Sequence, residues 1–171
     1  TLGYLSSGVP GTVAGLWSVH QRFGSMEWEE LLAPAIKLAR EGFDVTPYMQ
    51  DMLVKYHKKL STFPETKKIF QSNYPIFNKT LFIQKELSET LEIISKKGRD
   101  GFYTGAVASK IAKDMKSNGG IISKKDLKNY EPVWREPLIA NYRGSEIITM
   151  PPPSSGGVHI IQMLNILENY E

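Results

Sequence analysis

The chain has 171 residues, enough for one domain with a hydrophobic core. Its apolar (41%) and charged (23%) contents are ordinary for a globular protein, and its longest apolar stretches fall short of the roughly 20 residues that cross a bilayer. The absence of Cys excludes disulfides, thiol catalysis and Cys-ligated zinc from this chain. The net charge of +3 comes from scattered lysines, whose pairs we predict to be solvated helix faces rather than a nucleic-acid surface: 58–59, 67–68, 96–97 and 124–125.

The N-terminal part of the chain predicts a turn followed by helices. Small residues and glycines at 8–15 favour a tight turn that leads into a helix ending near Gly24. Ser25 is expected to cap the next helix. Because proline disrupts a helix interior, Pro34 predicts two short helices here, the second of which ends at Gly42.

The next segment begins with a clear helix start and then loses its periodicity. Thr46 followed by Pro47 predicts a cap and a first helical residue, and helical spacing continues to Leu60. Residues 61–80 read as a loop with one short helix. The Asn78-Lys79-Thr80 glycosylation pattern receives no role.

Two further helical patterns precede the C-terminal part of the chain, where the residue pattern becomes typical of strands. One ends at Gly98, and the other covers 107–115 and ends at Gly119. Ser123 with Asp126 three residues later resembles a capping box, which predicts a short helix.

The C-terminal part predicts a β-hairpin. Residues 138–142 and 145–150 alternate in polarity and contain β-branched residues, and Arg143-Gly144 lies between them at the expected turn.

A proline run and four small residues follow the hairpin. Residues 151–153 are expected to be extended, and the helix over 158–167 is apolar almost all round, so we expect it to be buried, in this chain or against parts outside it. The serines are predicted to cap this helix, whose unpaired first amides could also hold an anion or a carboxylate. Four residues are therefore structural candidates for a substrate contact: Ser154, Ser155, Gly156 and Gly157.

Two catalytic readings of the residues find little support. Thr1 with a free amine would be the minimal unit of an N-terminal nucleophile hydrolase, but no strand signal follows it, and we prefer to read it simply as the first residue of the sequence. A Ser154 or Ser155 triad lacks the Gly-x-Ser-x-Gly elbow, although three histidines are available: His20, His57 and His159. No His pair or acidic run has metal-ligand spacing. The residues thus predict a helix-rich α+β unit without a complete active site.

Five segments, in this order, resemble the γ-glutamyltransferase family, in its bacterial form. They are GVPGTVAGL at 8–16, LLAPAIKLAREGF at 31–43, GGIISKKDLKNYEPVWREPL at 119–138, YRG at 142–144 and MPPPSSGGVHIIQMLNILENY at 150–170. The resemblance covers almost the whole chain and is weakest between about 57 and 85.

The resemblance implies a self-cleaving precursor whose small subunit begins with the nucleophilic Thr. That Thr attacks the γ-glutamyl bond of glutathione or a related compound, and water or an amino acid then takes the glutamyl group. Residues 1–171 would be a single partial domain of the large subunit, the helix-rich portion of an αββα N-terminal nucleophile (Ntn) sandwich that ends in the hairpin and the buried helix. The implied partners are the small subunit and the substrate, no metal or organic cofactor is needed, and the location is periplasmic or secreted, although no signal peptide is visible in this chain.

No catalytic residue of the family transfers to this chain. Thr1 precedes the GVPGTVAGL segment and is not the nucleophile, and the substrate-binding Arg of the family lies upstream of position 1. Five arginines do not match its motif: Arg22, Arg40, Arg99, Arg135 and Arg143. The Ser-Ser and Gly-Gly pairs of the family's pocket belong to the small subunit, so residues 154–157 receive no transferred role. Two alternatives stay open, namely a related Ntn acylase or capsule transpeptidase, and a non-catalytic helical interaction module.

Overall fold

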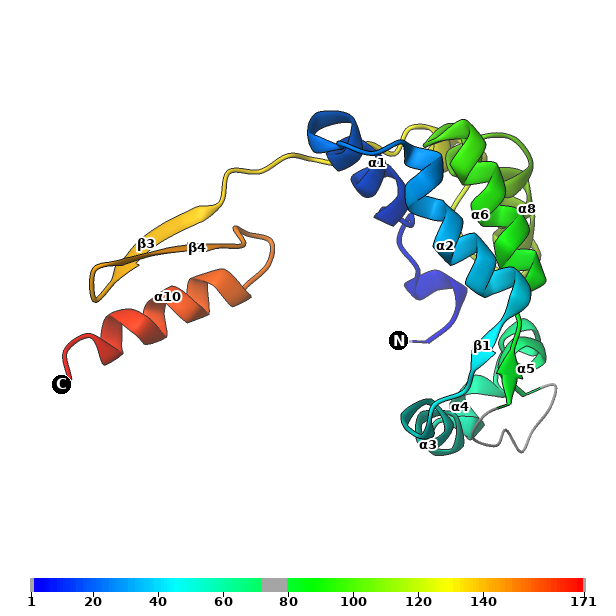
Figure 1. Cartoon of the computed structure of the whole chain (residues 1–171), viewed down its shortest axis with the longest axis horizontal. Coiled ribbons are helices and arrows are strands. Elements are labelled where there is room, and N and C mark those ends of the chain that lie inside the picture. Colours follow the sequence, from blue (N-terminus) through cyan, green and yellow to red (C-terminus); the bar gives the residue numbers. More distant parts are fainter. Residues whose placement is uncertain (1, 72–79, 171) are drawn as a thin grey trace. The chain divides into compact units, whose positions relative to one another are not determined.

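The computed structural model describes residues 2–71 and 80–170 and resolves them into two compact units. The first unit extends to Glu131 and the second from Pro132 to the end of the chain, and each is treated by itself. Figure 1 labels most of their helices and strands. The expectation of a single partial domain stays a prediction for the complete protein.

The first unit is almost entirely helical. Its elements are η1 (Tyr4–Ser6), α1 (Thr12–Phe23), α2 (Trp28–Glu41), β1 (Phe43–Asp44), α3 (Pro47–Lys55), α4 (His57–Leu60), α5 (Pro64–Gln71), β2 (Leu81–Phe82), α6 (Lys85–Lys97), α7 (Asp100–Tyr103), α8 (Gly105–Ser117) and α9 (Lys124–Lys128). The strands β1 and β2 form a short antiparallel pair, in which Phe43 lies opposite Phe82.

Two small hydrophobic clusters hold this unit together. The larger one joins α1, α7, α8 and α9 through five buried residues: Ala14, Tyr103, Ala108, Ile122 and Leu127. The smaller one joins α3 to β2 through Val45, Leu53 and Phe82, with Leu60 and Phe70 packed against it.

Most of the predicted helix boundaries are confirmed. Gly24, Gly42 and Gly98 follow the last residues of α1, α2 and α6. The Thr46 hydroxyl accepts a hydrogen bond from the Met49 N–H (3.2 Å), with Pro47 as the first helical residue. The capping box of α9 is also present. The glycosylation pattern lies largely outside the described residues.

The prediction that Pro34 separates two helices is wrong. Pro34 lies inside the continuous helix α2, which begins after Glu27 rather than with a Ser25 cap. The packing of α2 along α6 explains this continuity (Figure 1). The Trp28 indole donates to the Ile94 carbonyl (3.1 Å) at one end, and Arg40 pairs with Glu92 at the other. Tertiary contacts at both ends therefore outweigh the cost of about 3 kcal/mol for an internal proline.

The second unit is a β-hairpin with one helix packed on it. Strands β3 (Leu138–Tyr142) and β4 (Ser145–Thr149) pair antiparallel, and α10 (Gly156–Leu167) contacts β3. Arg143 (φ 49°) and Gly144 (φ 82°) form the predicted two-residue turn, in which both residues are left-handed, as a type I′ turn requires.

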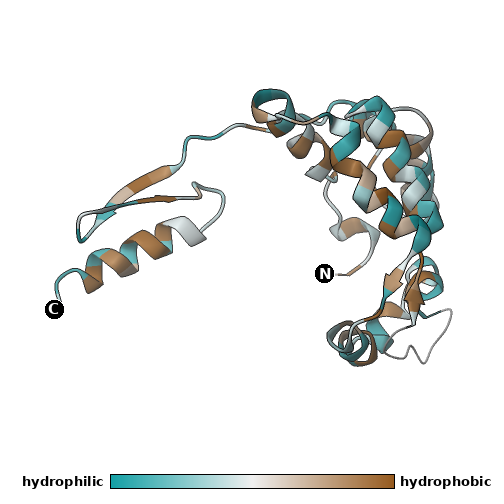
Figure 2. Cartoon of the chain, in the orientation of Figure 1, coloured by the Kyte–Doolittle hydropathy of each residue, from teal (hydrophilic) through white to brown (hydrophobic). Residues whose placement is uncertain are grey.

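In the second unit the proline run differs from the prediction, and the helix that follows it is not buried within the described residues. Pro151 to Pro153 are not extended, because the Ser154 N–H donates to the Pro151 carbonyl (3.2 Å) and closes a turn. The helix α10 is apolar along most of its length (Figure 2), yet its large side chains are not buried within this chain: Ile160, Met163, Ile166 and Leu167 are 43–60% exposed. Its burial against parts outside the chain stays a prediction.

Candidate functional site

The serine-glycine segment, residues 154–157, leads into α10. Ser154, Ser155 and Gly156 are exposed, whereas Gly157 is buried. A Cβ at Gly157 would lie 2.1 Å from the Met150 carbonyl oxygen, while one at Gly156 would meet only the Ser154 hydroxyl at 3.7 Å. Gly157 therefore lets the first turn of α10 lie against the end of β4, which is a packing role.

The predicted serine cap of α10 is wrong. Ser155 occupies the N-cap position but has helical dihedral angles (φ −78°, ψ −18°), and its side chain makes no capping hydrogen bond. An N-cap side chain reaches the next amides from an extended backbone, which Ser155 lacks. Its carbonyl accepts the first helical bond, from the His159 N–H (3.1 Å).

The three histidines are described by the contacts that each makes within its own unit. His159 is an exposed residue one turn beyond Ser155 on α10. His20 belongs to an aromatic group with Trp17 and Trp28, and its Nε2 lies 2.8 Å from the Met26 carbonyl oxygen. The His57 carbonyl accepts hydrogen bonds within the α4–α5 region. The described contacts of His20 and His57 are thus structural.

Two arginines outside the family's substrate motif have structural partners. Arg99 donates to the carbonyls of Lys128 (3.0 Å) and Tyr130 (2.5 Å), and it lies over the Tyr103 ring at 5.1 Å. Its buried Nε has no hydrogen-bond partner. Arg143 donates from its guanidinium to the Tyr170 carbonyl.

The buried hydroxyl of Tyr103 was not anticipated from the sequence. It accepts from the Ala14 N–H (3.1 Å) and donates to the Pro10 carbonyl (2.6 Å), so it ties the GVPGTVAGL segment to α7. Burial raises the pKa of this hydroxyl. A lone Tyr in a four-residue helix has no periodic signal that could have revealed this contact.

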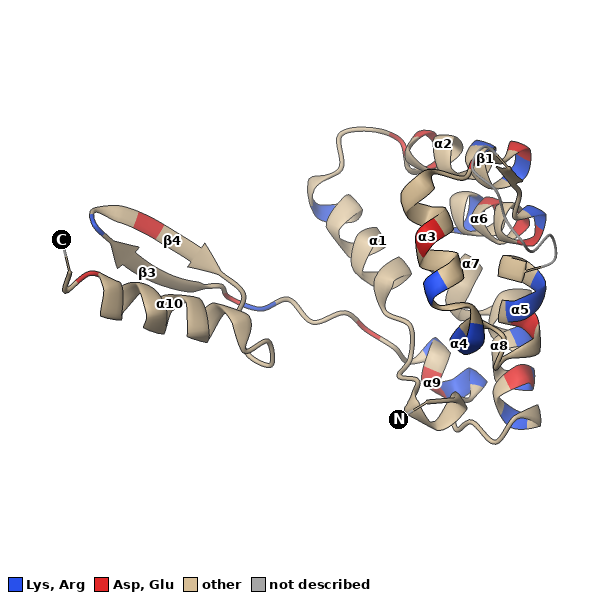
Figure 3. Ribbon diagram, turned by 90° about the horizontal axis from the view of Figure 1, so that it is seen from below, with Lys and Arg blue, Asp and Glu red and all other residues tan. Residues whose placement is uncertain are grey.

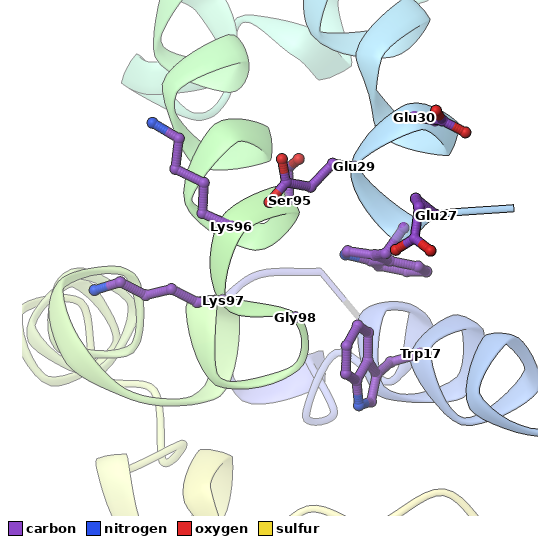
Figure 4. A pocket seen from close by; sticks show the side chains of 9 residues that line it. Trp17, Glu27, Glu29, Glu30, Ser95, Lys96, Lys97 and Gly98 are labelled. Carbon is purple, nitrogen blue, oxygen red and sulfur yellow. The ribbon is translucent and has the colours of Figure 1, made fainter.

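An open pocket of about 620 Å³ lies between the start of α2, the end of α6 and Trp17 of α1 (Figure 4). Glu27, Glu29 and Trp17 contribute to its lining, and Lys96 and Lys97 extend away from Trp17. The lining includes carboxylates and Ser95 but no histidine, and no hydrogen bond among the described contacts joins the Ser95 hydroxyl to a carboxylate. These contacts provide no nucleophile activated by a base.

Within residues 2–71 and 80–170, no three His, Asp or Glu side chains come together in a way that could hold a metal ion. None of the helices described there has the length and apolar character needed to span a bilayer.

The described residues form a helix-rich α+β fold, which solved structures of a gamma-glutamyltranspeptidase and of a cephalosporin acylase from Bacillus halodurans share. The sequence profile described as gamma-glutamyltranspeptidase matches residues 1–171, and the chain belongs to that family.

Individual relatives agree with this assignment. The chain is 43% identical to a glutathione hydrolase proenzyme of Escherichia coli over 170 residues, covering 98% of this chain and 29% of that protein. It is 44% identical to the solved gamma-glutamyltranspeptidase of Helicobacter pylori, with a TM-score of 0.95, covering 99% of this chain and 49% of that one. An acylase ACY 1 proenzyme of a Pseudomonas species is 39% identical, over 99% of this chain and 31% of that protein. The chain therefore spans about a third of the length of the curated relatives that it matches.

Proposed function

We propose that this chain is part of the large subunit of an enzyme that cleaves the γ-glutamyl bond of glutathione and related compounds. The observation that carries the proposal is the family match over residues 1–171, together with 43% identity to a glutathione hydrolase proenzyme. In this enzyme a Thr hydroxyl attacks the γ-glutamyl carbonyl, and its amine acts as the base. Water or an amino acid then receives the glutamyl group from the acyl-enzyme.

The nucleophile belongs to the small subunit of the same precursor, so this chain alone is inactive in the proposal. Residues 154–157 shape the packing around α10 rather than bind substrate. In support, Gly157 admits the helix against β4, and neither serine makes a capping bond that would orient it towards a ligand.

The hairpin and α10 belong, in this proposal, to the αββα sandwich of the complete protein. Ile139 and Ile148 lie opposite each other on β3 and β4, and both are 63% exposed. An isolated two-stranded ribbon with an exposed apolar face is only marginally stable. Further layers of the sandwich would cover this face. The exposed apolar side chains of α10 support the same conclusion.

The complete protein is proposed to be periplasmic or secreted and to work as a heterodimer of its two subunits. Glutathione or another γ-glutamyl compound is its substrate, and no metal or organic cofactor takes part. A second candidate activity is that of an Ntn acylase, favoured by the 39% identity to the acylase ACY 1 proenzyme. A non-catalytic interaction module is the remaining alternative.

The test is to express the complete reading frame and to offer the purified protein glutathione and a glutaryl amide in parallel. The glutaryl amide lacks the α-amino group of the γ-glutamyl compound, so the comparison separates the two activities. We expect self-cleavage into two chains and release of glutamate from glutathione. Preferred release of glutarate would establish the acylase, and an uncleaved protein that hydrolyses neither compound would establish the binding module.

A further inference from the structure

Another pocket of the first unit, with a volume of about 590 Å³, is formed by three segments that are far apart in the sequence. They are the segment around η1, the start of α5 and the end of α8. All three segments lie within the first unit. The fold of this unit therefore brings their side chains together around one hollow.

Two half-buried aromatic rings line this pocket. The ring centroids of Tyr4 and Phe63 are 6.4 Å apart, and the ring planes meet at 79°. Rings at nearly a right angle form a corner rather than one flat surface. Because a cation is attracted to an aromatic face from within about 6 Å of the ring centroid, a cation in this corner can be within reach of both rings.

The charged side chains that line the pocket are acidic. Figure 3 shows acidic and basic residues on both α5 and α8, yet the described lining includes Glu65 and Asp114 and no Lys, Arg or His. Desolvation raises the pKa of the Tyr4 hydroxyl, and so do a hydrogen bond with Asp114 and the negative charges of Asp114 and Glu65. Both carboxylates therefore act on the same aromatic residue.

The two carboxylates differ in how far a cation of the chain already neutralises them. Glu65 lies 3.8 Å from the Lys68 ammonium group, one turn further along α5. Asp114 accepts from the Asn118 side-chain amide (3.0 Å), but it forms no ion pair with any residue that the structure describes. Since a carboxylate has about four lone-pair positions, Asp114 can accept from a further donor.

The rest of the lining suits an ammonium group that carries an apolar body. Ser7 and Thr66 bring hydroxyl oxygens, which can accept hydrogen bonds from an ammonium group. Met115 adds a polarizable apolar side chain. A metal ion matches this lining less well, because the described part of the chain has no group of three His, Asp or Glu side chains that could hold one.

We propose that this pocket binds a small organic cation, namely a primary ammonium group on an apolar body. The ammonium group donates to the Asp114 carboxylate beside the rings of Tyr4 and Phe63, and the apolar body lies against Met115. Because Asp114 is exposed, ions screen part of this attraction, and binding should weaken as the salt concentration rises. The site is independent of the proposed γ-glutamyl chemistry.

The experiment is a titration of the complete protein with 2-phenylethylammonium, measured by ligand-observed NMR. The neutral compound of similar shape is 2-phenylethanol, which should bind about tenfold more weakly, because a charged donor bonds a carboxylate more strongly than a neutral one. Asp114→Asn keeps the shape of the side chain and removes its charge, so it should weaken binding of the ammonium compound about tenfold. Phe63→Leu should weaken it about two- to fivefold, because one aromatic wall is lost.

The matched control is Asp51→Asn, which removes the same charge from an exposed residue of α3 outside the described lining. It should change the affinity less than about twofold, because ions screen a charge outside the pocket. Equal losses from the two aspartate variants would mean that net charge alone acts, and would overturn the proposal.

Two other results would also overturn it, namely equal binding of the ammonium compound and the alcohol, or unchanged binding of the ammonium compound to Asp114→Asn. The melting temperature and the hydrolysis of a γ-glutamyl compound should be unchanged in both aspartate variants. A failure of this site can therefore be distinguished from a failure of the proposed enzyme activity.

Discussion

The backbone N–H of Arg143 donates to the Glu168 carboxylate at 2.9 Å, across 25 positions of sequence. The Arg143 guanidinium continues this link to the Tyr170 carbonyl. The turn of the hairpin is thereby fastened to the end of α10, while Gly157 admits the start of α10 against the end of β4. The second unit is held at both ends of its helix.

Replacing Glu168 by Ala should lower the free energy of unfolding by about 1 kcal/mol, the usual contribution of such a hydrogen bond. Urea unfolding of the 171-residue chain measures this change. Glu136→Ala, at an exposed residue of the segment before β3, should have no more than about 0.5 kcal/mol of effect. Equal effects would mean that the Arg143 contact does not contribute to stability.

Replacing Gly157 by Ala should lower the free energy of unfolding by about 1–3 kcal/mol, because the new methyl group overlaps the Met150 carbonyl. Gly156→Ala is the matched control, since its methyl group has room and alanine favours the helix. We expect the control to be neutral or slightly stabilising. If both variants unfold at the same urea concentration, the close approach of α10 and β4 is contradicted.

Replacing Tyr103 by Phe should lower the free energy of unfolding by about 1–3 kcal/mol, because the Ala14 N–H and the Pro10 carbonyl lose their buried partner. Tyr130→Phe is the control, since this ring stacks on Tyr103 at 5.7 Å and the change removes only a hydroxyl. If the Tyr130 variant loses as much stability as the Tyr103 variant, the two hydrogen bonds of the Tyr103 hydroxyl make no specific contribution.

The buried hydroxyl of Tyr103 also predicts that the folded chain loses stability in alkali. Burial raises the pKa of Tyr103 above its ordinary value, so in the folded chain this hydroxyl keeps its proton to higher pH than in the unfolded chain. The unfolded state then binds fewer protons, and stability falls as the pH rises above about 10. Part of this dependence should disappear in Tyr103→Phe. An unchanged pH profile of the unfolding midpoint would contradict the prediction.

The capping box predicts a second pH dependence, of opposite sign. Hydrogen bonds from the Ser123 hydroxyl and N–H to the Asp126 carboxylate lower the pKa of Asp126. Their stabilisation is present above the ordinary carboxyl range and is lost as the pH falls through the lowered pKa. Ser123→Ala should therefore destabilise the chain at neutral pH, because the helix loses its cap, and should destabilise it less in acid. Ser117→Ala, at an exposed residue near the end of α8, should show no such trend.

Local signals in the sequence predicted much of the fold. Thr46-Pro47, the Ser123–Asp126 pair and the terminal glycines act through their nearest neighbours, so their structures follow from a few adjacent residues. The Arg143-Gly144 turn is also determined by nearby residues, because the alternation of polar and apolar residues in the flanking strands sets its position.

Long-range contacts decided the features that sequence reasoning missed. Pro34 stays inside α2 because Trp28 and Arg40 bind α6, about 50 residues or more away in sequence. The pair β1–β2 has two residues in each strand, too few for an alternating pattern. Tyr103 reaches Pro10 and Ala14 across some 90 residues.

The role of residues 154–157 could not be predicted from the sequence for a different reason. Residues 154–157 could be selected from the sequence because of their unusual composition, but the same composition suits a cap, an anion site or a close packing contact. Only the geometry of Gly157 and the uncapped Ser155 distinguishes these roles. The family resemblance, by contrast, rested on long ordered segments, and the match over residues 1–171 confirmed it.

The proposed glutamyl-threonine intermediate can be detected directly in the intact mass of the complete protein after brief exposure to glutathione. We expect two chains produced by self-cleavage, with one glutamyl group added to the N-terminal Thr of the second chain and none on the chain that contains residues 1–171. A single uncleaved chain without an adduct, or an adduct on the chain that contains these residues, would contradict it.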